Sequence, residues 1–174
     1  MTSIATRLRS LLQADAATAP LWPLAMARIA LGVMWLWSLR WKLPPDFDGG
    51  AERSVGDWLD AAVEHAAFGW YGDLIDQLVV PNLTAFSWAL FAAEAITGMI
   101  LVSGAFTRIG AALGLALSVN LGIAMLAVPG EWPWAYAMMV MWHGTFLVSN
   151  PGHLWGVDGW LRTTDPHQLR GAAT

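Results

Sequence analysis

Residues 83–106 read LTAFSWALFAAEAITGMILVSGAF, and this stretch decides the fold. Its one charged side chain is Glu94, and the remaining residues are apolar, small or weakly polar. A helix needs roughly 20 such residues to cross a hydrocarbon core about 30 Å thick, at about 1.5 Å per residue. Lipid offers no partner to unpaired backbone groups, so a spanning stretch of this kind must be helical. The sequence therefore predicts a membrane-spanning helix here.

Three further stretches predict spans, at about residues 21–39, 109–128 and 132–148. Arg28 is the one charged side chain of residues 21–39, and residues 109–128 carry no charge. Short turns rich in Gly, Ser and Pro follow the second and third spans, which makes these neighbours antiparallel. We therefore expect an all-α fold, an integral membrane four-helix bundle.

The link between the first and second spans is long and carries most of the acidic residues. Apolar residues around Leu59 and Ala62 recur at helical spacing, and Ser54 is placed to begin that helix. A second apolar stripe at residues 74–79 ends at Pro81. We expect two short amphipathic helices at the membrane interface, covering one mouth of the bundle.

Composition excludes several classes of protein. Only 13% of the residues are charged and 56% are hydrophobic, whereas a soluble domain carries about 25% charged residues. The net charge is −4 and no basic stretch occurs, so nothing indicates a nucleic-acid partner. The chain has no cysteine, which excludes disulfides, thiolate ligands and a cysteine nucleophile. No cluster of His and carboxylates has the spacing of a metal site, so we expect no metal.

The chain divides into three parts. Residues 1–19 are expected to form an amphipathic segment on the membrane surface, residues 20–162 the membrane domain, and residues 163–174 a polar tail. Lys and Arg favour the cytoplasmic side of a membrane. Counted in short loops and termini, one side has Arg7, Arg9, Arg108, Arg162 and Arg170, and the other has Arg40, Lys42 and Arg53. This bias predicts a multi-pass protein with both termini in the cytoplasm.

Four polar side chains fall inside the predicted spans: Arg28, Glu94, Asn120 and His143. Each ionisable residue in a span costs at least about 2.5–3.5 kcal/mol, so each is a candidate for function. Counting residues from the cytoplasmic ends places all four within roughly 10 Å of depth. We therefore expect Arg28 and Glu94 to pair inside the bundle, either as a ligand-binding or proton-handling site or as a lock between two helices.

The other candidates have simpler alternatives. His143 lies near a span end and is equally suited to bonding a neighbouring helix, and Asn120 to holding helices together. Trp35 shares a helix face with Arg28 and is a candidate to line a pocket for a flat ring. A ridge of small residues along the third span favours close helix packing, within the bundle or between copies. The ridge consists of Gly110, Gly114, Ser118 and Gly122.

Several short segments, in this order, resemble the DoxX family of small four-helix membrane proteins, especially its DoxD-like branch. They are Arg28-Ile29-Ala30-Leu31-Gly32, Trp41-Lys42-Leu43-Pro44-Pro45, Glu94-Ala95-Ile96-Thr97-Gly98, Gly104-Ala105-Phe106-Thr107-Arg108 and Gly156-Val157-Asp158. The resemblance covers about residues 20–162. The DoxD-like branch is the small membrane subunit of thiosulfate:quinone oxidoreductase.

This resemblance implies a subunit of a bacterial or archaeal inner membrane, linked to quinone-dependent electron transfer. The family's characteristic Arg and Glu map onto Arg28 and Glu94, and its turn Arg onto Arg108. We therefore expect a quinone bound near Arg28 and Glu94, with no covalent cofactor. A carboxylate held near an Arg can relay the proton that quinone reduction needs. The electrons would come from a partner protein, in a membrane complex or homo-oligomer.

An alternative hypothesis makes the chain a structural or assembly subunit of a larger membrane complex, with no chemistry of its own. A transporter fits less well, because no broken helix or inverted repeat is evident.

Overall fold

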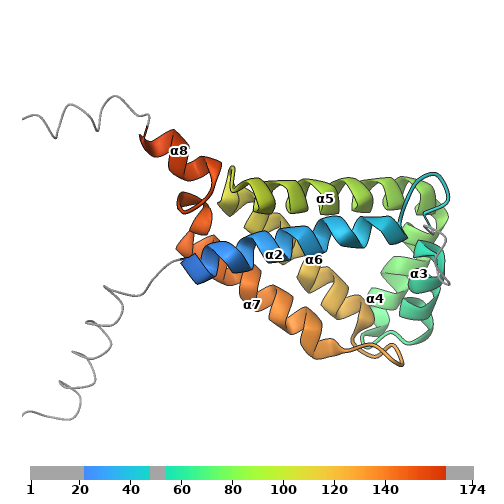
Figure 1. Cartoon of the computed structure of the whole chain (residues 1–174). Helices are drawn as coiled ribbons and strands as arrows, with labels where there is room; N and C mark the ends of the chain where they lie inside the picture. The colour runs from blue at the N-terminus through green and yellow to red at the C-terminus, as the bar shows by residue number, and fades with distance from the viewer. Residues whose placement is uncertain (1–21, 48–53, 164–174) are drawn as a thin grey trace, which may run out of the picture.

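The computed structural model describes residues 22–47 and 54–163, and all of its regular elements are helical. The four longest helices run antiparallel to their chain neighbours, and the seven shorter helical elements of the described residues lie at the two ends (Figure 1). The long helices are α2 (Trp22–Ser38), α5 (Leu83–Ser103), α6 (Thr107–Met125) and α7 (Pro133–Ser149). The predicted amphipathic segment at residues 1–19 and most of the polar tail lie outside the described residues.

Within the described residues, three helical stretches are long and apolar enough to cross a membrane: Trp22–Trp41, Gly69–Ser103 and Thr107–Met125. The all-α prediction is thereby confirmed, and a membrane protein is supported. The fourth predicted span is α7, whose 17 residues make it shorter than these three. At about 1.5 Å per residue, α7 extends for roughly 25 Å.

The acidic link contains the helix that the sequence predicted around Leu59. This helix is α3 (Val55–Glu64), and Ser54 caps it as expected. The Ser54 hydroxyl accepts from the backbone N–H of Asp57 at 3.2 Å, and the Asp57 carboxylate accepts from the N–H of Ser54 at 2.6 Å. This reciprocal capping box satisfies backbone groups at the start of the helix.

The second stripe of the link is also helical, although Pro81 does not break the chain into a loop. The α4 helix (Gly69–Leu74) continues into the π-helical η2 (Ile75–Val79) and the 3-10 turn η3 (Val80–Asn82), which leads directly into α5. Proline lacks an N–H and cannot continue an α-helical ladder. A change of helical type at Val80–Asn82 therefore takes the place of the expected interruption.

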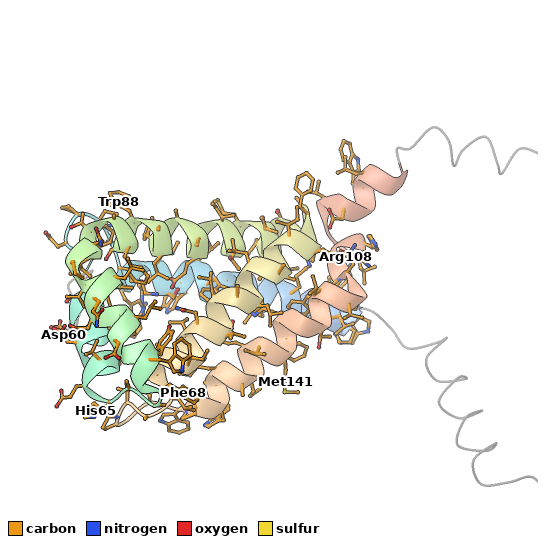
Figure 2. The ribbon with its side chains drawn as sticks, turned by 180° about the vertical axis from the view of Figure 1, so that it is seen from behind. Asp60, His65, Phe68, Trp88, Arg108 and Met141 are labelled. Carbon is orange, nitrogen blue, oxygen red and sulfur yellow. The ribbon has the colours of Figure 1, made fainter. Side chains whose placement is uncertain are left out.

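The long helices pack in chain order. The α2 helix packs along α5, α5 along α6, and α6 along α7. In Figure 1, α5 and α7 diverge toward the end where α3 and α4 lie. We call this the cavity end. The opposite end, which we call the hairpin end, holds the α5–α6 turn (Gly104–Phe106), η4 (Pro151–His153) and α8 (Val157–Thr163). Figure 2 shows Asp60, His65 and Phe68 at the cavity end and Arg108 at the hairpin end.

The predicted small-residue ridge on α6 is used inside the molecule. A Cβ added to Gly114 would come within 2.1 Å of Nε2 of His143 on α7, and one added to Gly110 within 2.2 Å of Ile100 on α5. Gly122 faces Tyr136 of α7. Of the two alternatives for this ridge, the structure shows packing within the chain.

Candidate functional site

A cavity of about 270 Å³ lies at the cavity end, beneath α3, α4 and η2. Its walls are mainly apolar and include Leu59 of α3, Ile75 of η2, Phe86 of α5 and Met125 of α6. Leu59, Ile75 and Met125 belong to one buried apolar cluster. The amphipathic stripes of the acidic link therefore turn inward to cover the divergent ends of the long helices.

Five polar side chains also line this cavity: Lys42, Tyr71, Asn120, Glu131 and Tyr136. A mainly apolar cavity with a few polar groups is the usual form of a small-molecule site. Lys42 and Glu131 lie in turns and Tyr136 in the first turn of α7, whereas Tyr71 lies within α4 and Asn120 within α6. These five residues and the apolar walls make up the candidate site.

Two hydrogen-bonded pairs organise the site. The Tyr71 hydroxyl donates to Oδ1 of Asn120 at 2.7 Å, and the Tyr136 hydroxyl donates to Oε2 of Glu131 at 2.5 Å. Asn120 lines the cavity and is exposed. Within the described part of the chain, its amide nitrogen makes no hydrogen bond, so it can donate to a ligand.

Lys42, the remaining polar side chain of the site, follows the short turn η1 (Leu39–Trp41) at the end of α2. Its Nζ lies 2.5 Å from Oε1 of Glu94, whose side chain is fully buried in α5. The Ser38 hydroxyl lies 3.0 Å from the second oxygen of Glu94. The Glu94 carboxylate is thus paired with Lys42. Ionised groups in an apolar setting usually have such a partner.

The predicted pairing of Arg28 with Glu94 is therefore wrong. Arg28 is fully buried near the start of α2, where its guanidinium donates to the carbonyls of Leu101, Val102 (3.3 Å) and Trp155 (3.1 Å). Because α2 and α5 are antiparallel, Arg28 meets the last turn of α5, whereas Glu94 meets the end of α2. About ten residues of α2 separate the two positions, or roughly 15 Å of helix.

Trp35 and His143, which the sequence singled out separately, meet in the middle of the bundle. Trp35 Nε1 donates to His143 Nε2 at 3.1 Å, and His143 Nδ1 lies 2.7 Å from the carbonyl of Met139. Ser118 lies 3.3 Å from the same Nδ1. Both ring nitrogens are thus satisfied within the chain, with a bonding pattern that requires the Nδ1–H tautomer. This cluster links α2, α6 and α7 and does not border the cavity.

The hairpin end brings together two segments of the resemblance that are far apart in the sequence. The carboxylate of Asp158 accepts from the backbone N–H groups of Phe106 at 2.7 Å and Thr107 at 3.0 Å. The N–H of Asp158 donates to the carbonyl of Gly104 at 3.0 Å. Burial alone would raise the pKa of Asp158, but hydrogen bonds from Thr107 and Phe106 outweigh it and lower this pKa. Asp158 therefore caps α6 from a distant part of the chain.

Gly104 is required at this junction for two reasons. Its φ is +66°, which L side chains rarely adopt, and an added Cβ would lie 2.5 Å from a guanidinium nitrogen of Arg28. The hairpin end is therefore closely packed around the Arg28 guanidinium, and a separate hollow of about 300 Å³ lies beside it, bordered by Arg108, His153 and Asp158.

Of the residues that the sequence proposed for the site, Asn120 alone lines the cavity, and Glu94 touches it through Lys42. Sequence reasoning missed Lys42, Tyr71, Glu131 and Tyr136 as a group. Lys42 was visible as one of two cations, with Arg40, that closely follow the first span, but nothing local marks the two tyrosines. Among the described residues, no group of His, Asp and Glu is arranged to hold a metal ion.

Comparisons with models of known families, with curated proteins and with solved structures gave no match to this chain.

Proposed function

We propose that α2, α5, α6 and α7 all cross the membrane as a four-helix bundle, with α3 and α4 at one surface and α8 at the other. The exposed Trp132 and Trp134 at the start of α7 support this placement, since Trp is enriched at membrane interfaces. The bias of Lys and Arg supports a cytoplasmic position for the hairpin end and both termini. The cavity then lies near the outer surface.

Within that frame, the chain is a DoxX/DoxD-like membrane subunit that binds a quinone headgroup and works with a partner protein that supplies the electrons. The observation that carries this proposal is the cavity of about 270 Å³ with its mixed lining. A quinone headgroup is a flat, neutral ring with carbonyl oxygens at opposite edges. It needs apolar walls for its faces and donors for its oxygens.

The lining of the cavity matches these needs. Leu59, Ile75 and Met125 offer apolar contacts, while the Lys42 ammonium and the Asn120 amide offer donors on different elements. The proposal differs from the sequence prediction in the residues involved, because Arg28, Trp35 and His143 do not line this cavity. Their contacts support a role in holding the helices together.

The alternative, a structural subunit of a larger complex, receives less support from the packing. The Gly and Ser ridge on α6 faces α5 and α7 of the same chain, so it is not left over for another protein. The experiment below separates the two hypotheses.

Filling the cavity tests the proposed function. Ala124 lies on α6, lines the cavity and is buried, whereas Ala116 lies on the same helix and is exposed. We expect Ala124→Phe to lower the affinity for a short-chain ubiquinone, decylubiquinone, at least about tenfold, because an aromatic ring then occupies the ligand volume. Affinity is measured by equilibrium dialysis of the detergent-purified protein.

Ala116→Phe is the matched control, with the same substitution on the same helix, and it should bind as the unchanged protein does. The thermal unfolding of both variants checks that the fold survives, because overpacking costs about 1–3 kcal/mol. An unchanged protein that binds no decylubiquinone, but that purifies within a stable larger complex, would point to the structural hypothesis instead.

A further inference from the structure

Glu94 is sealed away from the cavity. Its side chain has no exposed surface, and its oxygens are occupied by Lys42 Nζ at 2.5 Å and by the Ser38 hydroxyl at 3.0 Å. It forms no part of the cavity wall. A ligand in the cavity therefore cannot touch this carboxylate, although the sequence makes it the most conspicuous acid in the spans.

Lys42 occupies the opposite position, because it is the member of the pair that meets the open space. Its side chain is 22% exposed and borders the main cavity. It also borders a second hollow of about 170 Å³ beside Trp41 and Trp58. An ammonium group has three donors, and Glu94 is the one partner of Nζ within residues 22–47 and 54–163.

The pair also fixes the electrostatics of the site. A lysine side chain is long and flexible, and ordering it costs up to about 2 kcal/mol of side-chain entropy. A charge-assisted hydrogen bond to a buried carboxylate holds the ammonium in one place. Glu94 also neutralises the charge of Lys42, and the Glu131 carboxylate lines the same cavity, so the cavity offers a strong donor without a net positive charge. Such a donor suits a neutral carbonyl better than an anion.

We propose that Lys42 donates a hydrogen bond to a carbonyl oxygen of the ligand in this cavity, and that Glu94 is the positioning residue that holds its ammonium in place. This inference rests on the proposed function, and it names the contact that recognises the neutral ring. In this inference Glu94 does not contact the ligand, although the sequence had suggested that it does, but holds the Lys42 ammonium in position.

Four variants test the inference: Lys42→Met, Glu94→Gln, the double variant Lys42→Met/Glu94→Gln, and the conservative Lys42→Arg. Lys42→Met should weaken decylubiquinone binding about ten- to a hundredfold, the range expected for a lost hydrogen bond from a charged donor. Glu94→Gln should weaken it by a smaller factor, because the donor remains but is no longer held. Lys42→Arg keeps a charged donor and should recover most of the affinity.

The double variant separates ligand contact from structural support. Each single substitution leaves one group of a buried pair without its partner, and removing both relieves that penalty. We therefore expect the double variant to unfold at a higher temperature than either single variant, while its affinity stays as low as that of Lys42→Met. Arg40 is an exposed cation on the same segment. Arg40→Met is the control: it should leave the affinity unchanged and lower the unfolding temperature only slightly, by the loss of an exposed cation–π contact with Trp37.

The possible outcomes are distinct. A double variant that binds decylubiquinone as the unchanged protein does would show that the pair is only structural, and would overturn the inference alone. Glu94→Gln with full affinity would remove the positioning role. Binding by the unchanged protein that laurate, a carboxylate amphiphile, displaces as readily as quinone would overturn the preference for a neutral ligand. An unchanged protein that binds no quinone would instead overturn the proposed function itself.

Discussion

A buried guanidinium without a carboxylate partner needs several acceptors, and Arg28 finds them in backbone carbonyls. Leu101 and Val102 belong to the last turn of α5, where helix carbonyls have no intrahelical partner and the helix dipole is negative. Trp155 contributes a carbonyl from the segment before α8. One side chain therefore caps one helix and ties two distant parts of the chain to α2.

This arrangement predicts that Arg28 governs stability and not ligand affinity. Arg28→Ala should lower the free energy of unfolding by about 2–5 kcal/mol, because it removes several charge-assisted hydrogen bonds and leaves carbonyls buried. Thermal or denaturant unfolding in detergent measures this loss.

Arg40→Ala is the matched control for Arg28→Ala. Its guanidinium lies over the exposed ring of Trp37 at 3.9 Å, and an exposed cation–π contact is worth about 0.5–1 kcal/mol. If Arg28→Ala folds stably but loses decylubiquinone binding, the ligand role that the sequence first suggested for Arg28 is restored.

For single residues, the sequence correctly singled out Arg28 and Glu94 as polar side chains inside the bundle, but it did not predict their partners. Counting residues along each span gives a depth, but depth does not give the register between two helices. In the structure, an added Cβ on Gly32 would touch Val102, and one on Gly98 would touch Leu36. With that register, Arg28 lies beside the last turn of α5. Glu94 lies beside Lys42, which follows the first predicted span.

At the scale of the helices, the local predictions hold where a cap or turn chemistry decides the outcome. Ser54 begins α3 through its capping box, and Gly104 ends α5 with a positive φ. The start of α6 was not foreseeable in the same way. Its cap comes from Asp158, about fifty residues later in the chain, and no local pattern around Thr107 reveals such a partner.

The distant cap of α6 predicts a pH-dependent stability. Because the pKa of Asp158 is lowered in the folded protein, its contribution is present above the pKa of an unfolded Asp, about 3.9. The contribution is lost as the pH falls through the lower folded value. Asp158→Asn should therefore be less stable than the unchanged protein at pH 7 by about 1 kcal/mol, because the two N–H groups bind separate oxygens of the carboxylate and an amide has one acceptor oxygen.

The difference between Asp158→Asn and the unchanged protein should narrow when unfolding is measured below about pH 4. Asp60→Asn, which changes an exposed carboxylate on α3 (Figure 2), provides the comparison and should show no such convergence. A gap for Asp158→Asn that stays constant between pH 7 and pH 3 would mean that the cap does not depend on its charge.

At the scale of the whole molecule, the candidate ligand site and the Arg28 cluster lie at opposite ends. At the cavity end the long helices diverge over a mainly apolar cavity, and short helices cover it. At the hairpin end Arg28 and Asp158 bind backbone groups of distant segments, beside a separate hollow. The sequence predicted the covering helices, because their apolar stripes are regular. It did not predict the cavity beneath them, because Tyr71, Asn120 and Tyr136 come from three segments that only the fold brings together.

The proposed four-span topology can be tested without background labelling, because the chain has no cysteine. Trp132→Cys and Val148→Cys place single thiols at the two ends of α7, both at exposed positions. We expect a membrane-impermeant maleimide to label Trp132→Cys from the outer side of sealed cells and Val148→Cys only after permeabilisation.

Labelling of both positions from the same side would mean that α7 does not cross the membrane. Asp60→Cys at the cavity end and Ser103→Cys at the hairpin end calibrate the two sides, because α5 lies between them and is long enough to span. Reversed labelling of this calibrating pair would invert the proposed orientation and leave the number of spans unchanged.

The carbonyls around Arg28 also have a consequence for the order of synthesis. The guanidinium of α2 leaves the ribosome early, whereas two of its acceptors lie 73 and 74 residues further along the chain and a third lies 127 residues further. In a chain inserted from its amino end, the Arg28 guanidinium of α2 therefore has none of these carbonyl acceptors until α5 has been inserted. Arg28 gains the Trp155 carbonyl only when the segment after α7 has been translated. A nascent chain stalled before Trp155 would hold its arginine by the end of α5 alone.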